Sequence, residues 1–334
     1  MIGLLWVGFL ALVLVGISLD LGLLRRRPHE ITPREALAWT GFWIGEALAF
    51  SGVVYLVYES QWQGWGVQVE RSTTGVEAVW LFLGSYLMEK SLSLDNVVVM
   101  ACIFSDFRVP RALQHHVLLL GVLGAVVFRF VMLVCGVALI EHFAFVTYVF
   151  GAILLLSAVR MLLPGSETLQ SEDHFVRRIL GRFLPIHDAY EGRRFVVRRG
   201  PKRYLTRLAI VLALVESSDL VFALDSIPAV LAITTDPFLV VTSNVFAILG
   251  LRSLFFAITP LMEKFRYLKA GLVALLGLVG VKLIISHHVE IPALVTLAAI
   301  VGIVLVCVAA SVLVGWREHR VLPARGEPGG TGES

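Results

Sequence analysis

Long apolar runs alternate with short polar segments over almost the whole chain. Nine of these runs are close to or longer than the roughly 20 residues that an α-helix needs to cross a bilayer. Because a bilayer offers no water to exposed backbone groups, such runs must form helices. The pattern predicts an all-α polytopic membrane protein with about nine transmembrane helices, at 2–23, 35–58, 76–104, 111–140, 142–163, 204–232, 237–258, 267–286 and 291–315.

The overall composition agrees with this fold class. Of the 334 residues, 57% are hydrophobic and 16% are charged, whereas soluble domains are nearer to half apolar and a quarter charged. The basic residues flank the spans and form no soluble basic domain, so we expect no nucleic-acid partner. No Walker motif or other phosphate-binding signature is present, and we expect no organic cofactor.

The polar segments divide the chain into parts. We expect a single transmembrane domain over 1–317 and a disordered cytoplasmic tail over 318–334. Within that domain, two groups of three spans are separated by a polar, arginine-rich cytoplasmic loop, and three further spans are peripheral. The boundaries are 76–163 for the first group, 164–203 for the loop, 204–286 for the second group, and 2–23, 35–58 and 291–315 for the peripheral spans.

Positive charge is distributed unevenly between the two sides of the predicted bundle. One side carries 22 of the 28 Lys and Arg, counting Arg111 at the start of a span. The other side carries only Arg71. By the positive-inside rule, this places the N-terminus outside and the C-terminus in the cytoplasm. The basic side consists of loops 24–34, 105–110, 164–207, 259–269 and the tail.

The two groups of three spans resemble each other in their charged positions. EKSLSLDNVVVMA (89–101) aligns with SDLVFALDSIPAVLA (218–232), so that Asp95 matches Asp225, Glu89 matches Asp219 and Asn96 matches Ser226. In the following spans, Arg129 matches Arg252 and Arg160 matches Lys282. Since spans three and six run in opposite directions, the pattern predicts an inverted repeat of spans 3–5 and 6–8, which is typical of secondary transporters.

Five carboxylates within these spans are the candidate site. A carboxylate at the bilayer centre costs about 2.5–3.5 kcal/mol on translocon scales, so the acids are expected to face protein or water rather than lipid. Carboxylate, amide and hydroxyl oxygens are the ligands that hard divalent cations prefer. The predicted metal ligands are Glu89, Asp95, Glu216, Asp219 and Asp225, with Ser93, Asn96 and Ser226 as auxiliary ligands and Arg129, Arg252 and Lys282 as charge-balancing residues.

The charged positions allow more than one interpretation. Asp95 and Asp225 lie about 120° around a regular helix from the acids six residues before them, so either they have another partner or the helix is interrupted. Pro228 favours an interruption of span six, because it frees the carbonyl of Leu224. Alternatively, the basic residues form buried ion pairs that only fix the packing, although five acids against three bases leave a negative surplus.

EKSLSLDNVVVM and ESSDLVFALDSIPAV together resemble the signature segments of the TerC/Alx family of integral membrane proteins, over residues 3–317. The resemblance implies a bacterial inner (plasma) membrane protein of the LysE-type transporter superfamily that exports manganese and is linked by name to tellurium resistance. It also implies that the five acids carry the metal.

The leading hypothesis is a secondary transporter that exports divalent metal ions, with Mn²⁺ as the transported substrate, by alternating access. A non-transporting scaffold for metal loading, or a role in tellurite resistance, is the alternative. An intramembrane metalloprotease is not expected, because no HExxH motif occurs. Partners are the metal ion and membrane lipids; the sequence leaves the oligomeric state open.

Overall fold

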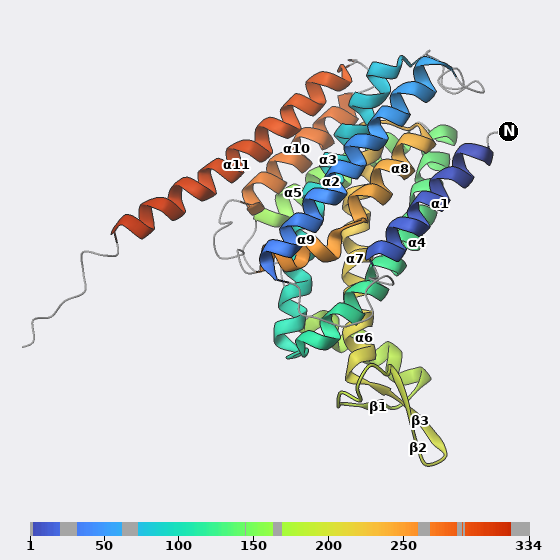
Figure 1. The fold of residues 1–334 in the computed structure, drawn as a ribbon, viewed down its shortest axis with the longest axis vertical. Coiled ribbons are helices and arrows are strands. Elements are labelled where there is room, and N and C mark those ends of the chain that lie inside the picture. Colours follow the sequence, from blue (N-terminus) through green and yellow to red (C-terminus); the bar gives the residue numbers. More distant parts are fainter. Residues whose placement is uncertain are drawn as a thin grey trace, which may run out of the picture.

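The computed structural model describes residues 3–20, 32–61, 73–143, 145–162, 169–259, 268–285, 289 and 291–321. Within these ranges the chain is mostly helical, with a small sheet (Figure 1). The membrane-type helices are α1 (Gly3–Asp20), α2 (Pro33–Glu59), α3 (Gly75–Asp106), α4 (Arg111–His142), α5 (Phe145–Leu162), α7 (Arg207–Leu231), α8 (Pro237–Ile248), α9 (Leu251–Ile258), α10 (Leu268–Ile285) and α11 (Ala293–Val321).

These helices follow the predicted spans closely. In the described residues, four helices are long and apolar enough to cross a membrane, or five if the bent pair α8 and α9 is one span. The four are α2, α4, α5 and α11, whereas α1 and α10 contain shorter apolar stretches. The two acidic helices, α3 and α7, are not among them, since each carries several charged residues. The fold class is therefore confirmed as helical and membrane-type, and nine spans remain a prediction.

The interruption expected in span six lies elsewhere. Helix α7 continues through Pro228 to Leu231, so the prediction of a break at Pro228 was wrong. Pro228 cannot donate to the Leu224 carbonyl, but residues 226–231 are all buried, so packing against neighbouring helices keeps the last turn helical. The break occurs instead between α8 and α9, which are bent by 42°.

The helices of the two three-span groups pack against each other in a crossed pattern. Helix α3 contacts α8, α4 contacts α7, and α5 contacts α10. The α5–α10 contact is close because glycines meet there: a Cβ on Gly280 would lie 3.2 Å from the Gly151 carbonyl oxygen. Each helix of one group therefore has its main partner in the other group.

An aromatic core lies on one side of this arrangement. Rings from α1, α2, α3 and α8 meet there, and the ring centroids of Phe50 and Phe246 are 4.6 Å apart. The other members are Phe9, Phe82 and Phe238. This packing holds α8 against the N-terminal helices through contacts worth about 0.5–1.5 kcal/mol per aromatic pair beyond the buried area.

The expected loop at 164–203 contains regular structure. Helix α6 (Leu169–Phe183) is followed by β1 (Ile186–His187), β2 (Val196–Arg199) and β3 (Lys202–Thr206), in the sheet order β1-β3-β2. Strands β2 and β3 are antiparallel, with Val197 opposite Tyr204, and β1 is parallel to β3. The Tyr190 hydroxyl donates to the Phe107 carbonyl at 2.8 Å, which ties this part to the end of α3.

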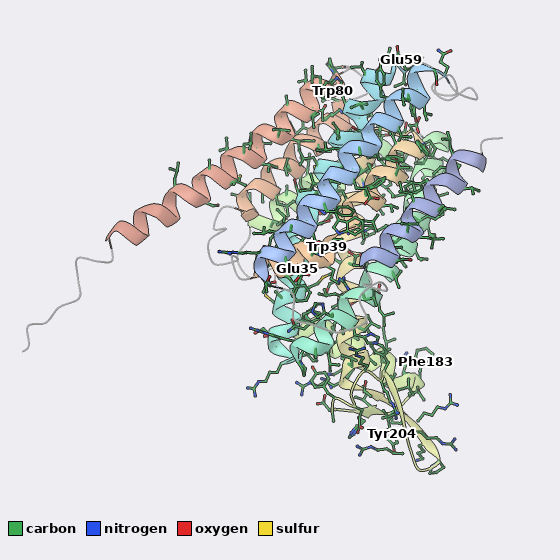
Figure 2. The ribbon with its side chains drawn as sticks, in the orientation of Figure 1. Glu35, Trp39, Glu59, Trp80, Phe183 and Tyr204 are labelled. Atoms are coloured by element: carbon green, nitrogen blue, oxygen red, sulfur yellow. The ribbon has the colours of Figure 1, made fainter. Side chains whose placement is uncertain are left out.

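The sheet projects from one end of the helical bundle. Figure 2 shows Phe183 and Tyr204 at this end, with Glu35 at the end of α2 that faces them and Glu59 at the opposite end. The N-terminal end of α1 also lies at the opposite end (Figure 1). Helix α11 continues to Val321, so residues 318–321 of the expected disordered tail are helical, and 322–334 lie outside the described residues.

Candidate functional site

Two of the five predicted acids come together in the interior. Glu89 lies in the middle of α3 and is 0% exposed, and Asp219 lies in α7 and is 6% exposed. The alignment of the two charged motifs in the sequence pairs these same two residues. The structure therefore brings one acid from each group to a common place.

Arg129 of α4 joins these two carboxylates. Its Nη1 forms an ion pair with Glu89 Oε1, and on the other side its Nη2 and Nε lie 2.9 and 3.3 Å from Asp219 Oδ1 and Oδ2. The guanidinium is only 2% exposed. We call this set the Glu89–Arg129–Asp219 bridge. The planar, five-donor guanidinium suits it, because a lysine ammonium cannot grip one carboxylate in two places and reach a second.

Amide and hydroxyl side chains complete the surroundings of the bridge. Asn96 Nδ2 of α3 donates to Asp219 Oδ1 at 3.1 Å, and Asn244 Nδ2 of α8 donates to Glu89 Oε2 at 3.0 Å. Arg129 Nη1 also lies 3.4 Å from Ser226 Oγ. Four helices thus contribute to one buried polar cluster, made of Glu89, Asn96, Arg129, Asp219, Ser226 and Asn244. Ser93 is buried one turn after Glu89 on the same face of α3.

Several oxygens in this cluster or beside it have no hydrogen-bond donor. Among the described residues, Ser93 Oγ, Asn96 Oδ1 and Asn244 Oδ1 are buried without a partner. Both amides point their nitrogen at a carboxylate, which leaves their oxygen free. An unpaired buried polar atom costs about 1–3 kcal/mol, and these three oxygens are therefore acceptors with lone pairs to offer to a donor or a cation.

The electrostatic balance of the cluster is negative. With both carboxylates ionised, two negative charges face one guanidinium, which leaves one net negative charge in a buried place. Glu216 lies one helical turn before Asp219 on α7 and interacts electrostatically with it. The cluster can therefore attract a cation, and its free oxygens can coordinate one.

Glu216 itself lies beside the cluster, on the surface of α4. Its carboxylate covers Gly124, where a Cβ would come within 2.2 Å of Glu216 Oε1. Val215 rests in the same way on Gly121, at 3.1 Å. The two glycines thus let α7 approach α4 closely and give the half-buried Glu216 side chain its place.

Asp225 belongs to a different place. Its Oδ1 accepts a hydrogen bond of 2.6 Å from the Ser157 hydroxyl of α5, and Arg160, one turn further on α5, interacts with it electrostatically. The sequence allowed either a separate partner for Asp225 or an interrupted helix. Helix α7 is continuous at Asp225, so the separate partner is correct.

The remaining predicted residues are partly placed. Arg252 is half-buried on α9 and Lys282 is half-buried on α10, both outside the Glu89–Arg129–Asp219 bridge. The backbone of Asp95 is in α3, and its side chain lies outside the described residues. Among the side chains that are described, no three of His, Cys, Asp and Glu converge as a metal-binding group.

Asn244 is a functional candidate that the sequence reasoning missed. It lies in VVTSNVFAIL, where a single amide interrupts an apolar run. A buried amide in a membrane-type helix needs a partner, and that signal points to a polar site although it does not identify Glu89 as the partner.

A helical bundle of this kind, with charged and amide side chains buried between apolar helices, defines the chain as an integral membrane protein with an internal polar site. The model of the TerC family of integral membrane proteins matches residues 74–321, and the chain belongs to that family. The matched range includes α3 to α11, and with them every residue of the cluster.

Curated relatives match over nearly their full length. The "Putative membrane-bound redox modulator Alx" of Escherichia coli K12 is 40% identical over 318 residues, covering 95% of this chain and 97% of the relative. The "Uncharacterized membrane protein STKORF319" of Myxococcus xanthus is 40% identical over 309 residues, covering 92% of each. An "Uncharacterized membrane protein" of Rickettsia bellii is 33% identical over 308 residues, covering 92% of this chain and 97% of the relative. No solved structure matches.

Proposed function

We propose that this protein is a secondary transporter that exports divalent metal ions, with Mn²⁺ as the main substrate, from the cytoplasm of a bacterium. The observation that carries the proposal is the Glu89–Arg129–Asp219 bridge. In it, one acid from each group of spans forms an ion pair with the same buried guanidinium. The proposal places the chain in the inner membrane with its basic sheet in the cytoplasm.

The ligand chemistry of the cluster favours a hard divalent ion. Two carboxylates, two amide oxygens and hydroxyl groups form an oxygen set, and the described part of the cluster contains neither sulfur nor imidazole. Such a set suits Mn²⁺, Mg²⁺ or Ca²⁺ better than zinc or copper. Two carboxylates also neutralise a divalent ion completely, whereas the single charge of Arg129 leaves them half neutralised.

Arg129 then acts as a tethered counter-ion. When no metal is bound, the guanidinium holds both carboxylates and so offsets the cost of burying them. For a metal to reach both acids, the guanidinium must withdraw, and its contact with Ser226 offers a first step away from Glu89. The guanidinium and the metal would compete for the same two carboxylates. Arg129 would therefore close the site when it is empty and leave it when metal is bound.

The crossed packing supports alternating access. Because α3 pairs with α8 and α4 with α7, the cluster lies where the two groups of spans meet. In the predicted inverted repeat, rocking of one group against the other would expose this place first to the cytoplasm and then to the outside.

Manganese uptake into everted membrane vesicles tests the proposal. Vesicles with the wild-type chain should accumulate radioactive manganese from the medium, because an exporter moves it into their lumen. Glu89→Gln and Asp219→Asn should reduce this uptake to the level of vesicles without the protein, and Glu191→Gln, in the exposed sheet region, should leave it unchanged. Wild-type uptake in both cluster variants would show that these acids do not carry the metal.

A scaffold that binds metal without moving it is the second candidate, because it would need the same oxygen set. Purified protein whose thermal stability rises with Mn²⁺, without uptake in vesicles, would favour this role. Direct transport of tellurite is disfavoured, since an oxyanion requires basic ligands and the cluster has a surplus of acid.

A further inference from the structure

The break between α8 and α9 exposes main-chain carbonyls inside the bundle. Helix α8 ends at Ile248, Gly250 has φ +80°, and a new helix starts at Leu251. The last carbonyls of a helix have no partner within it, and the helix dipole makes that end negative. Ala247 and Leu249, at this end, are 0% and 2% exposed, so water does not solvate these carbonyls freely.

Lys90 of α3 supplies the missing partner. Its Nζ donates to the Ala247 carbonyl at 3.0 Å and lies 3.4 Å from the Leu249 carbonyl. The side chain crosses from one group of spans to the other, because α3 belongs to the first and α8 to the second. The positive charge thus lies at the negative end of α8, where a cation is most favourable.

The bend is also shaped by a tryptophan. Trp43 of α2 is 1% exposed and lies directly over Gly250, where a Cβ would come within 2.4 Å of the indole ring. A side chain at this position would therefore clash, in addition to the strain of a positive φ. The break is therefore in contact with two side chains from other helices, the Trp43 ring and the Lys90 ammonium.

Glu89 and Lys90 are neighbours in α3, and both hold the last turns of α8. Glu89 accepts from Asn244, and Lys90 donates to the carbonyl three residues further on. From this geometry we propose that the end of α8 is a second cation site, distinct from the Glu89–Arg129–Asp219 bridge, which the tethered ammonium of Lys90 occupies and thereby holds the break in its bent form.

The chemistry of this site suits a monovalent cation. Neutral carbonyl oxygens and a helix end provide only partial negative charge, which balances one positive charge better than two. If Lys90 loses its ammonium, the same oxygens would accept a small free cation such as methylammonium or Na⁺. Within the transport cycle, and resting on the proposed function, release of Lys90 would free the break between α8 and α9 to change its angle.

Hydrogen–deuterium exchange on the purified full-length protein tests the site without requiring transport. In Lys90→Met, the amides of Leu249 and Leu254, which bond to the carbonyls of Val245 and Gly250, should exchange about tenfold faster than in the wild type. Ser91→Ala is the matched control, since the Ser91 hydroxyl bonds only to the Leu87 carbonyl of its own helix in the described contacts. If Lys90→Met does not fold, Lys90→Gln replaces it. Its amide can still donate to the carbonyls but carries no charge, so exchange should be faster than in the wild type by a smaller factor.

A rescue experiment tests the cation site itself. Lys90→Ala leaves space at the carbonyls, so methylammonium or Na⁺ should slow exchange at Leu249 and Leu254 towards the wild-type rate, and choline at the same concentration should not. Wild-type exchange in Lys90→Met would overturn the proposed role of Lys90. Fast exchange that neither small cation slows would overturn the site. If Lys90→Met exchanges faster and small cations slow the exchange of Lys90→Ala, but wild-type vesicles take up no manganese, the cation site is supported and the transport proposal is overturned.

Discussion

Arg129 grips Asp219 with two nitrogens, at 2.9 and 3.3 Å, while a third contact reaches Glu89 on a different helix. Loss of this bridge would leave two carboxylates buried without a counter-charge, which costs on the order of 3–5 kcal/mol. We therefore expect Arg129→Gln to lower the thermal stability of the purified protein strongly. Mn²⁺ should restore part of that stability, because it replaces the missing charge.

Arg129→Lys separates charge from geometry. It keeps the positive charge but cannot form the bidentate contact, so its stability should fall between those of the wild type and Arg129→Gln. A thermal-shift series with and without Mn²⁺ measures both effects. Equal stability of all three proteins would contradict a structural role of the bridge.

Asn244 holds the other oxygen of Glu89. Asn244→Leu removes the donor to Glu89 Oε2 and should destabilise the protein by about 1–3 kcal/mol, the cost of an unsatisfied buried acceptor. If the Asn244 oxygen also coordinates the metal, Asn244→Leu should weaken the Mn²⁺-induced thermal shift as well. Thr242→Val, two residues away with its hydroxyl bonded to its own helix at the Phe238 carbonyl, is the control.

Gly124 gives Glu216 its position. Gly124→Ala places a methyl group where the flexible carboxylate now lies, so Glu216 should move while the fold remains stable. We expect manganese uptake to fall if Glu216 lies on the path of the ion, with a small change in thermal stability. Gly45→Ala on α2, where nothing lies within 4 Å of the new Cβ, should leave both quantities unchanged.

A Ser157 variant tests whether the surroundings of Asp225 contribute to stability independently of the buried polar cluster. Ser157→Ala removes a 2.6 Å hydrogen bond to a carboxylate and should destabilise the protein by about 1.5–3 kcal/mol. Its effect should add to that of Asn244→Leu, because the two residues contact different acids. Non-additive stability changes in the double variant would show that the two places are coupled.

Much of the bundle could be predicted because its signal is local. Apolar runs define helix positions, and the ends of α3, α4 and α7 lie within three residues of the expected ones. Glu89 and Asp219, which the alignment of the charged motifs pairs, both contact Arg129, and the inverted repeat itself stays a prediction. The strands at 186–206 were missed because they are short and rich in arginine, and they form only through pairing across the hairpin and with β1.

By itself, the sequence determined which segments are helices of a membrane protein and which acids need a buried partner, because hydropathy and the cost of burying charge depend on each residue and its near neighbours. Only the tertiary structure decided the partners of Glu89, Asp219 and Asp225, and where a span breaks. Arg129 has a long side chain, so it contacts two acids on different helices. Asp225 instead accepts a hydrogen bond from Ser157. A proline near a helix end costs one hydrogen bond, whereas the break at Gly250 needs Lys90 and Trp43 from other helices to stabilise it.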